Sequence, residues 1–545
     1  MEEDNANLPK KLELKDHYLN HISEPIVKNT IVYGACENSG LVCNPMAIFR
    51  GFLADPSFTN YKHIWLIQDE MQLKNLLDNY GDNKSVTFVL SNRSNRQYYA
   101  KILATSHYFI LNYNLPNFFV KRRGQVCICT WHGISLAGLS LNNIKDYIHS
   151  SKHFRNLLIS DFIISPNKFM TNFFLQSFKL QNIYNGKIIQ EGHPRSDIII
   201  KNSKVDAIKI LHDIPIFVTE KKKLILYAPS PQEDSEPASI EKATKIFVKT
   251  FKSFITSRDY ILLILPHYSL YNHFSEKTKK TLKIIPPYVD VCEILNAVDI
   301  LITDYNNIYF DFLHTFRPIL FYIPSLPVIN EEDIKSEQQL PGPIINDIQT
   351  LVQNIINISK EIVIHNYTHK YMKNWPFKSD DGNVSKRIVD AIFNSNYKRY
   401  NYFSLNNNKE TLLLYIGDLN INSDTISFIN GIDIIKYDVT LFFLKECDID
   451  FLKSLKNEIR SYFMININNL SKENEGDVQQ SKEEENSTND NFEQTNNFKL
   501  EKAKLFGDIV FNYGIDLTQG NSWFSNILPY VCSRTIPLEV FKMEM

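Results

Sequence analysis

Four clusters of polar side chains could carry chemistry, and each directly follows a short apolar run. They are Thr130-Trp131-His132-Gly133, Gly192-His193-Pro194-Arg195-Ser196-Asp197, Tyr227-Ala228-Pro229-Ser230 with Leu265-Pro266-His267-Tyr268, and Thr303-Asp304-Tyr305-Asn306-Asn307 continuing to Asp311. Because ligands of doubly wound proteins bind at the carboxyl ends of parallel strands, this shared position predicts a common site.

Each cluster taken alone also fits a purely structural role. His132 could be a core histidine packed on Trp131, and His267 could be a turn residue after a proline. Arg195 could pair locally with Asp197, and residues 303–307 could cap a helix. The common position at strand ends is what favours a functional interpretation.

The residue types in these clusters suit phosphate chemistry. Amides, hydroxyls and N–H groups at a helix start, as in 303–307, bind phosphate oxygens. His267 and Arg195 could offset the charge of a diphosphate, and His132 could act as a general base near neutral pH. The sequence contains no glycine-rich Walker loop or dense aspartate cluster for Mg²⁺, which disfavours a kinase or ATPase. No metal site and no cofactor is predicted.

The elements that must position these residues follow a βα pattern, in which β-branched runs alternate with amphipathic stretches. Among the expected strands are 30–33, 63–67, 85–90, 108–112, 126–130, 162–165, 188–191, 223–227, 261–265, 300–303 and 319–322. The pattern predicts an α/β protein with an extension at 1–27 and two Rossmann-like, doubly wound halves at 28–215 and 216–398. A cleft between the halves would hold the ligand.

A further α/β module is predicted at 409–545, with strands at 411–417 and 437–444. Residues 471–497 are acidic, rich in Asn, Gln and Ser, and poor in large apolar side chains. Such a composition predicts a disordered insertion.

The composition indicates which partners and which cellular compartment to expect. The 545 residues are 43% hydrophobic with a formal net charge of −2, so nothing in the overall charge predicts a nucleic-acid partner. Seven scattered cysteines are typical of reduced thiols in the cytosol. Neither a signal peptide nor an apolar run long enough to span a membrane is expected, which predicts an intracellular protein.

An ordered series of motifs resembles the CDP-glycerol glycerophosphotransferases, a family that includes the teichoic acid polymerases and primases. The resemblance extends from about Ile31 to Phe393. It is carried by Cys43–Ile48, Lys121–Gln125, Thr130–Gly133, Ser165–Phe169, Gly192–Asp197, Leu226–Pro229, Thr303–Tyr305 with Phe310–Phe312, Arg317-Pro318, Pro341–Pro343, and Asp381-Gly382 with Ser385 and Arg387.

The resemblance implies a GT-B-like fold and a bacterial enzyme. It would transfer glycerol phosphate, or a related polyol phosphate, from a CDP-activated donor to a hydroxyl of a lipid-linked cell-wall or capsular polymer, and release CMP. His132 would act at the acceptor hydroxyl and His267 beside the diphosphate. The residues expected to bind substrate are Trp131, Gly133, Ile134, Ser135, Arg195, Pro229, Ser230, Leu265, Pro266, Asp290, Thr303, Asp304, Tyr305, Asn306, Asn307 and Asp311.

A lipid-linked acceptor also implies a cytoplasmic protein held peripherally on the inner face of the plasma membrane. The basic and aromatic stretch Phe118–Arg123 could meet anionic headgroups or could be an ordinary loop.

The sequence departs from the family pattern at three places. After His132-Gly133 the family usually has Thr-Pro-Leu-Lys, where this chain has Ile134–Ala137. Ser230–Gln232 replaces Thr-Trp-Arg, and Asn306-Asn307 replaces paired serines. The identity of the polyol therefore stays open, and a nucleotide-sugar glycosyltransferase and a degenerate, non-catalytic scaffold are the alternatives. The module from about Thr411 resembles a truncated N-terminal half of a GT4-like glycosyltransferase.

Overall fold

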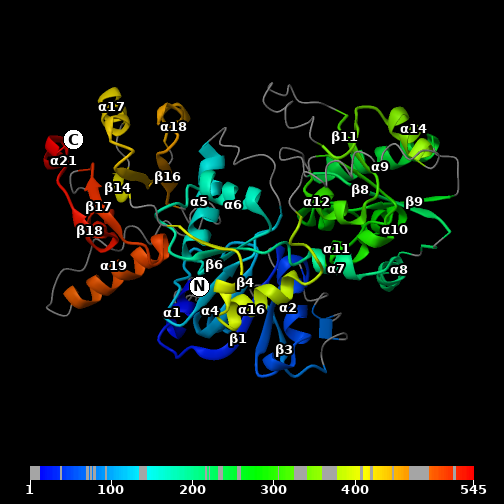
Figure 1. Ribbon diagram of the computed structural model, residues 1–545, viewed down its shortest axis with the longest axis horizontal. Coiled ribbons are helices and arrows are strands. Elements are labelled where there is room, and N and C mark those ends of the chain that lie inside the picture. The colour runs from blue at the N-terminus through cyan, green and yellow to red at the C-terminus, as the bar shows by residue number, and fades with distance from the viewer. Residues whose placement is uncertain are drawn as a thin grey trace, which may run out of the picture.

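The computed structural model describes residues 13–36, 40–68, 73, 76–77, 82–91, 95–133, 144–214, 216, 218–219, 221–230, 237–254, 259–304, 306–324, 340–358, 377–405, 409–417, 421–444, 447–464, 490–518 and 523–544. The described strands form three sheets, which we call the first, second and third units together with the helices around each (Figure 1). The α/β class expected from the sequence is confirmed.

The first unit contains an eight-stranded sheet in the order β13-β7-β6-β5-β4-β1-β2-β3. Its strands are β1 (Val27–Gly34), β2 (Lys62–Ile67), β3 (Val86–Leu90), β4 (Ser106–Leu111), β5 (Val126–Cys129), β6 (Phe162–Ser165), β7 (Lys187–Gln190) and β13 (Tyr402–Ser404). Its helices are α1 (Leu14–His21), α2 (Cys43–Leu53), α4 (Arg96–Thr105), α5 (Ile144–Ile159) and α6 (Lys168–Gln176). The next two helices along the chain, α7 (Ser196–Lys201) and α8 (Lys204–Asp213), lie against the second unit (Figure 1). Buried residues run consecutively along the central strands of the first sheet because helices cover both faces of a parallel sheet.

The second unit is a five-stranded parallel sheet in the order β12-β11-β10-β8-β9. Its strands are β8 (Lys223–Ala228), β9 (Tyr260–Ile264), β10 (Ile300–Thr303), β11 (Ile319–Tyr322) and β12 (Ile344–Ile345). Its helices include α9 (Pro237–Phe254), α10 (Glu276–Leu282), α11 (Val291–Ile294), α12 (Ile308–Phe312) and α14 (Ile348–Ile358). The strand order reverses between β8 and β10, so the loops after these two strands lie at the position where such sheets bind ligands.

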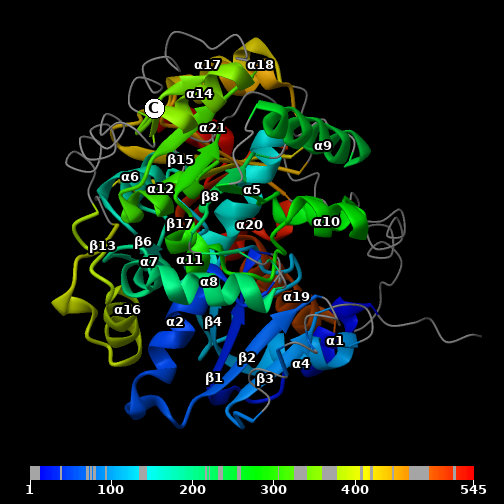
Figure 2. The ribbon, with the colours of Figure 1, turned by 90° about the vertical axis from the view of Figure 1, so that its right-hand side faces the viewer.

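The chain returns to the first unit after the second sheet (Figures 1 and 2). Helix α16 (Val384–Phe393) shares a core with α2, and the rings of Phe52 and Phe393 are 4.6 Å apart. Gly51 permits this approach, since a Cβ there would lie 3.2 Å from Ser385 Cβ. Strand β13 then pairs antiparallel with β7. Thus 384–404 packs on the first sheet, although the sequence predicted that the second half continues to 398.

The third unit is a parallel sheet in the order β16-β15-β14-β17-β18. Its strands are β14 (Glu410–Gly417), β15 (Tyr437–Phe443), β16 (Arg460–Phe463), β17 (Phe511–Asp516) and β18 (Cys532–Thr535). Its helices are α17 (Ser423–Gly431), α18 (Ile449–Ser454), α19 (Asp490–Phe506), α20 (Leu528–Val531) and α21 (Leu538–Glu544). Part of its hydrophobic core is continuous with that of the first unit through residues such as Phe154, Phe442 and Tyr462.

Helix α19 corrects one prediction about this unit. Residues 490–497 were expected to be the end of a disordered insertion, but they form the first turns of α19. The later turns of the helix place Phe506 in the core, and helix formation is cooperative, so the polar turns before it extend the same helix. Residues 471–489 lie outside the described part of the chain.

Among the described helices, none combines the length and the apolar character that crossing a bilayer requires.

Candidate active site

His132 lies exposed at the end of β5, so the interpretation of this residue as a buried core histidine is wrong. Its ring stacks on Trp131, with 4.7 Å between the ring centroids. Trp131 has a φ of 51°, a left-handed conformation that is strained for a bulky side chain and is often found at functional sites. The rings of Phe174 and Phe178 meet the Trp131 ring edge-on at 5.4 and 5.6 Å. The apolar neighbours therefore hold Trp131, and Trp131 supports the imidazole.

Two buried side chains fix the backbone of this loop. Asn44, at the start of α2, donates from Nδ2 to the carbonyls of Thr130 and Trp131 at 3.0 and 3.2 Å. Arg195 donates from Nη1 to the carbonyl of His132 at 3.0 Å. From the sequence we predicted a role for Arg195 but none for Asn44, although Asn44 lies within the motif Cys43–Ile48.

Arg195 joins the first unit to the second. Its Nε donates to Oδ1 of Asp311 on α12 at 2.8 Å, and both side chains are buried. Burial raises the pKa of Asp311, and the Arg195 charge opposes that shift. The local Arg195–Asp197 pair considered from the sequence is wrong, because Asp197 accepts hydrogen bonds from the backbone N–H groups of Val384 and Ser385 instead.

Gly133 lies at the contact between the two units. A Cβ on Gly133 would lie 3.6 Å from Nη2 of Arg195 and 3.6 Å from the amide nitrogen of Asn307. The structure thus brings together residues from the ends of β5, β7 and β10, as the strand-end argument predicts.

Asp304 and Asn306 organise the loops of the second sheet. Both carboxylate oxygens of Asp304 accept from the backbone N–H of Ser230 at 2.9 Å, and Oδ1 also accepts from the Ser230 hydroxyl. The Oδ1 atom of Asn306 accepts from the N–H of Ile308 at 3.1 Å, which is a helix-capping contact. Thr303 is fully buried and donates to the carbonyl of Ala228 at 2.7 Å.

The predicted helix start after Thr303 is present, but α12 is only five residues long and continues as a 3₁₀ turn. The carbonyl oxygen of the Asn306 side chain is already used by the cap. What this residue could offer a phosphate is therefore its amide nitrogen.

His267 follows β9 with Leu265 and Pro266. The N–H of Leu265 donates to the carbonyl of Tyr227 at 2.9 Å, which holds this strand end beside Pro229 and Ser230 after β8. His267 is partly buried, and burial lowers its pKa, so the neutral imidazole is favoured. Strand β8 lies between β9 and β10, so the strand end that carries His267 is two strands away from the loop after Thr303.

Asp290 caps α11 and lies at a second contact between the first two units. Its Oδ1 accepts from the N–H of Cys292 at 3.2 Å, and its Oδ2 is 3.9 Å from Nη1 of Arg50 on α2. Burial raises the pKa of Asp290 to about 7, while the Arg50 charge lowers it and the neighbouring Glu293 raises it. This carboxyl can therefore be protonated near neutral pH.

Two supports of the site were missed from the sequence. Asp380 accepts from the N–H of His193 at 2.8 Å, and its other oxygen lies 3.1 Å from Nε2 of His314. Gly192 has a φ of 108°, and a Cβ there would lie only 2.4 Å from Asp380 Oδ1, so the motif requires glycine at this point. His153 on α5 lies near His132, with 6.2 Å between the ring centroids.

Three predicted site residues, Ile134, Ser135 and Tyr305, lie outside the described part of the chain. Within the described ranges, no group of three or more His, Cys, Asp or Glu side chains is arranged to hold a metal ion.

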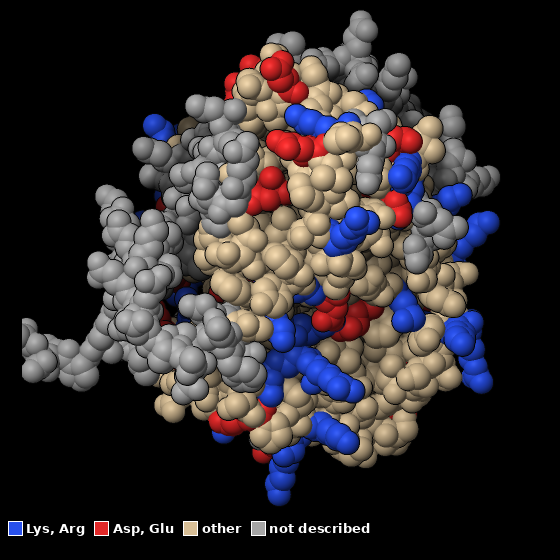
Figure 3. Space-filling model, turned by 90° about the vertical axis from the view of Figure 1, so that its left-hand side faces the viewer, with Lys and Arg blue, Asp and Glu red and all other residues tan. Residues whose placement is uncertain are grey.

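The stretch Phe118–Arg123 is not a free surface for lipid. Phe119 and Val120 are buried, and Lys121 forms ion pairs of 3.0 Å with both Asp161 and Asp508. Arg122 donates to the carbonyls of Ala104 and Glu24. Basic side chains do gather on the face of Figure 3, with acidic side chains beside them. The proposed anchor is therefore wrong, because most of its residues join elements of the protein.

Comparison with known proteins gives a consistent result. The family described as CDP-Glycerol:Poly(glycerophosphate) glycerophosphotransferase matches residues 17–394. A teichoic acid poly(glycerol phosphate) polymerase of Bacillus spizizenii is 27% identical over 385 residues, which cover 68% of this chain and 93% of the relative. A teichoic acid ribitol-phosphate primase of the same species is 26% identical over 307 residues, covering 53% and 75%.

The structure of the wall teichoic acid polymerase TagF has a TM-score of 0.55 and 22% identity, and the match covers 71% of this chain and 94% of that one. This similarity confirms the predicted GT-B-like arrangement of the first two units.

Proposed function

The chain belongs to the CDP-glycerol:poly(glycerophosphate) glycerophosphotransferase family, and on that premise we propose that it transfers a polyol phosphate from a CDP-polyol to a hydroxyl of a teichoic-acid-type polymer. The observation that carries the proposal is the meeting of exposed His132 with Arg195 and Asn307 around Gly133. This arrangement supports a base on the acceptor side and an amide donor, Asn307, from the second unit acting near one another.

The proposed reaction is an in-line substitution at the phosphorus that bears the polyol. The acceptor hydroxyl attacks this phosphorus while His132 takes its proton. A new phosphodiester forms, the bond between this phosphorus and the bridging oxygen breaks, and CMP leaves with the bonding electrons. Removing the proton during attack makes the hydroxyl oxygen a better nucleophile.

The second unit would hold the donor. In the proposal, the amide nitrogens of Asn306 and Asn307 donate to the diphosphate, where the leaving CMP develops negative charge, and Ser230, whose hydroxyl is held by Asp304, lines the donor side. His267 contacts the same diphosphate, and Asp290, Pro229, Leu265 and Pro266 line the donor side. Arg195 and Asp311 position the loops, because their charges are already paired with each other.

Glycerol phosphate is the proposed transferred group, with ribitol phosphate as the alternative, because both kinds of transferase are among the relatives. The acceptor would be lipid-linked and reached at the cytoplasmic face of the plasma membrane. The first unit would serve the acceptor and the second the donor, and the third unit would be a GT4-like module without its own transferase activity.

A donor panel tests the proposal. The purified protein is incubated with a short polyol-phosphate primer and with CDP-glycerol, CDP-ribitol or UDP-sugars, and the released nucleotide is quantified. Primer-dependent CMP release from a CDP-polyol is the expected result. Release of UDP would favour the glycosyltransferase, and no release from any donor would favour the scaffold.

A further inference from the structure

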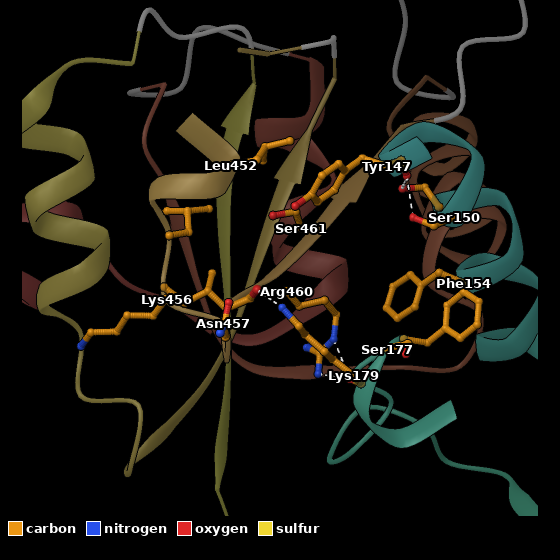
Figure 4. A pocket seen from close by; sticks show the side chains of 14 residues that line it. Tyr147, Ser150, Phe154, Ser177, Lys179, Leu452, Lys456, Asn457, Arg460 and Ser461 are labelled. Atoms are coloured by element: carbon orange, nitrogen blue, oxygen red, sulfur yellow. Dashed lines mark hydrogen bonds between the residues drawn. The ribbon is translucent and has the colours of Figure 1, made fainter. Parts of the chain in front are cut away.

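A polar pocket lies between the first and third units, away from the site described above (Figure 4). Helix α5 and the end of α6 form one wall, and α18, β16 and the turn between them form the other.

The charge of this lining has one sign. Three of the described lining residues, Lys179, Lys456 and Arg460, are basic, and none is Asp or Glu. Arg460 is paired with Asp438 at 2.8 Å, and its other N–H groups donate to the hydroxyl of Thr440 and to the carbonyls of Lys179 and Gln181. Lys179 donates to the uncharged carbonyl of Ile459 at 2.7 Å. Lys456 is exposed and its side chain extends away from Arg460 in Figure 4. Lys179, which uses one of its three N–H groups on Ile459, therefore supplies the cationic donor inside the pocket, and Arg460 adds its positive charge from the wall.

The surroundings of Lys179 destabilise its charged form, and a bound anion would stabilise that form. Burial and the Arg460 charge together lower the pKa of Lys179 to about 8, while Glu458 and Asp438 oppose the shift. Hydroxyl groups of Ser177 and Ser461 lie around the pocket and can donate to phosphate oxygens or to polyol hydroxyls, while that of Ser150 donates to the carbonyl of Tyr147 at 2.8 Å.

The pocket is also linked to His132 through side chains already described. Phe178 lines the pocket and packs edge-on against Trp131, which supports His132. Helix α5 contributes Phe154 to the pocket and the adjacent His153 to the surroundings of His132. An anion held here would therefore lie behind the acceptor side of the site.

We propose that this pocket binds a phosphodiester of the acceptor chain, at a distance from the hydroxyl that reacts. This inference rests on the proposed function, which identifies the acceptor polymer. The cationic, hydroxyl-lined pocket provides the chemistry for binding its phosphodiester. It gives the third unit a role, since residues 452–461 build half of a site that the family match of 17–394 does not contain.

Binding is tested without a donor, so that the result does not depend on catalysis. Glycerol-phosphate oligomers of increasing length and inorganic phosphate are titrated by calorimetry into the full chain and its variants. Ser461→Asp places a negative charge among the cations, and Ser461→Asn is its matched neutral control. Lys179→Gln removes one cation, and Lys453→Gln on the exposed surface of α18, outside the pocket lining, is the control for lost charge. Melting curves check that each variant folds.

We expect Ser461→Asp and Lys179→Gln to weaken oligomer binding about tenfold, the effect of one charge-assisted hydrogen bond, while both controls and CDP affinity stay unchanged. Unchanged oligomer affinity in folded Ser461→Asp would overturn the proposal. Binding of inorganic phosphate as tight as that of the oligomers would also overturn it, by indicating a site for a small free anion. CMP release with a short primer separately reports whether the proposed function fails.

Discussion

The ion pair between Arg195 and Asp311 offers a prediction whose size follows from its surroundings. The two side chains are 9% and 4% exposed, and the Nε–Oδ1 distance is 2.8 Å. Asp311→Asn removes the negative charge of this carboxylate and leaves the buried guanidinium with the His132 carbonyl and the Cys43 sulfur as partners. Breaking one side of a buried pair costs about 3–5 kcal/mol, against about 0–1 kcal/mol for an exposed pair. We therefore expect the free energy of unfolding to fall by about 3–5 kcal/mol.

A double substitution separates stability from positioning. Arg195→Met with Asp311→Leu removes both charges and fills the space with apolar side chains. Such a replacement of a buried pair is often close to neutral, so the double variant should be more stable than Asp311→Asn. It still lacks the Arg195 hydrogen bond to the His132 carbonyl, so its transfer rate should stay low. Urea denaturation of the single and double variants, with CMP release beside it, measures both effects. A loss below about 1 kcal/mol in Asp311→Asn would refute the reasoning, because the pair would then behave as a solvated one.

Three other predictions concern single residues of the site. His132→Ala should lower kcat by about 10²–10⁴ without changing CDP affinity, and a wild-type kcat in CMP release would contradict the assignment of the base. Asn306→Asp keeps the cap on Ile308 but sets a charge against the diphosphate, so calorimetry should show weaker CDP binding; unchanged affinity would leave the cap as its only role. Burial holds the pKa of Asp290 at about 7 in the folded protein, above its usual value near 4, so the folded state binds more protons between these values. The contribution of Asp290 therefore makes the stability of the folded state fall as pH rises from about 4 to about 7. The melting temperature should fall less across this range in Asp290→Asn than in the wild type, and an identical pH dependence in the two proteins would contradict this prediction.

Much of the fold could be predicted because the strands of parallel sheets are buried on both faces and appear as short β-branched runs. The expected strand 126–130 corresponds to β5, and 223–227 corresponds to β8. The two-residue β12 is too short to give a pattern, and the side chains of β13 are exposed. The polar first turns of α19 lack an apolar pattern of their own, since packing later in the helix stabilises them.

The site could be predicted as a set of strand ends but not as a set of contacts. Arg195 was recognised, yet its partner is 116 residues away rather than two, because the second unit brings α12 against the first. The use of the Asn306 side-chain oxygen as a cap depends on the exact path of the loop. Asn44 acts through backbone carbonyls of a loop 86 and 87 residues further on, a contact that residue types alone do not reveal.

Primer extension is the most direct test of the central claim, that His132 and the donor-side loops act together in polyol-phosphate transfer. A defined glycerol-phosphate primer is incubated with CDP-glycerol and the purified protein, and the products are weighed by mass spectrometry while CMP is quantified. We predict primers lengthened by whole glycerol-phosphate units, one CMP for each unit added, and no extension with folded His132→Ala. Unextended primer with both CDP-glycerol and CDP-ribitol, or equal extension by His132→Ala, would contradict the claim.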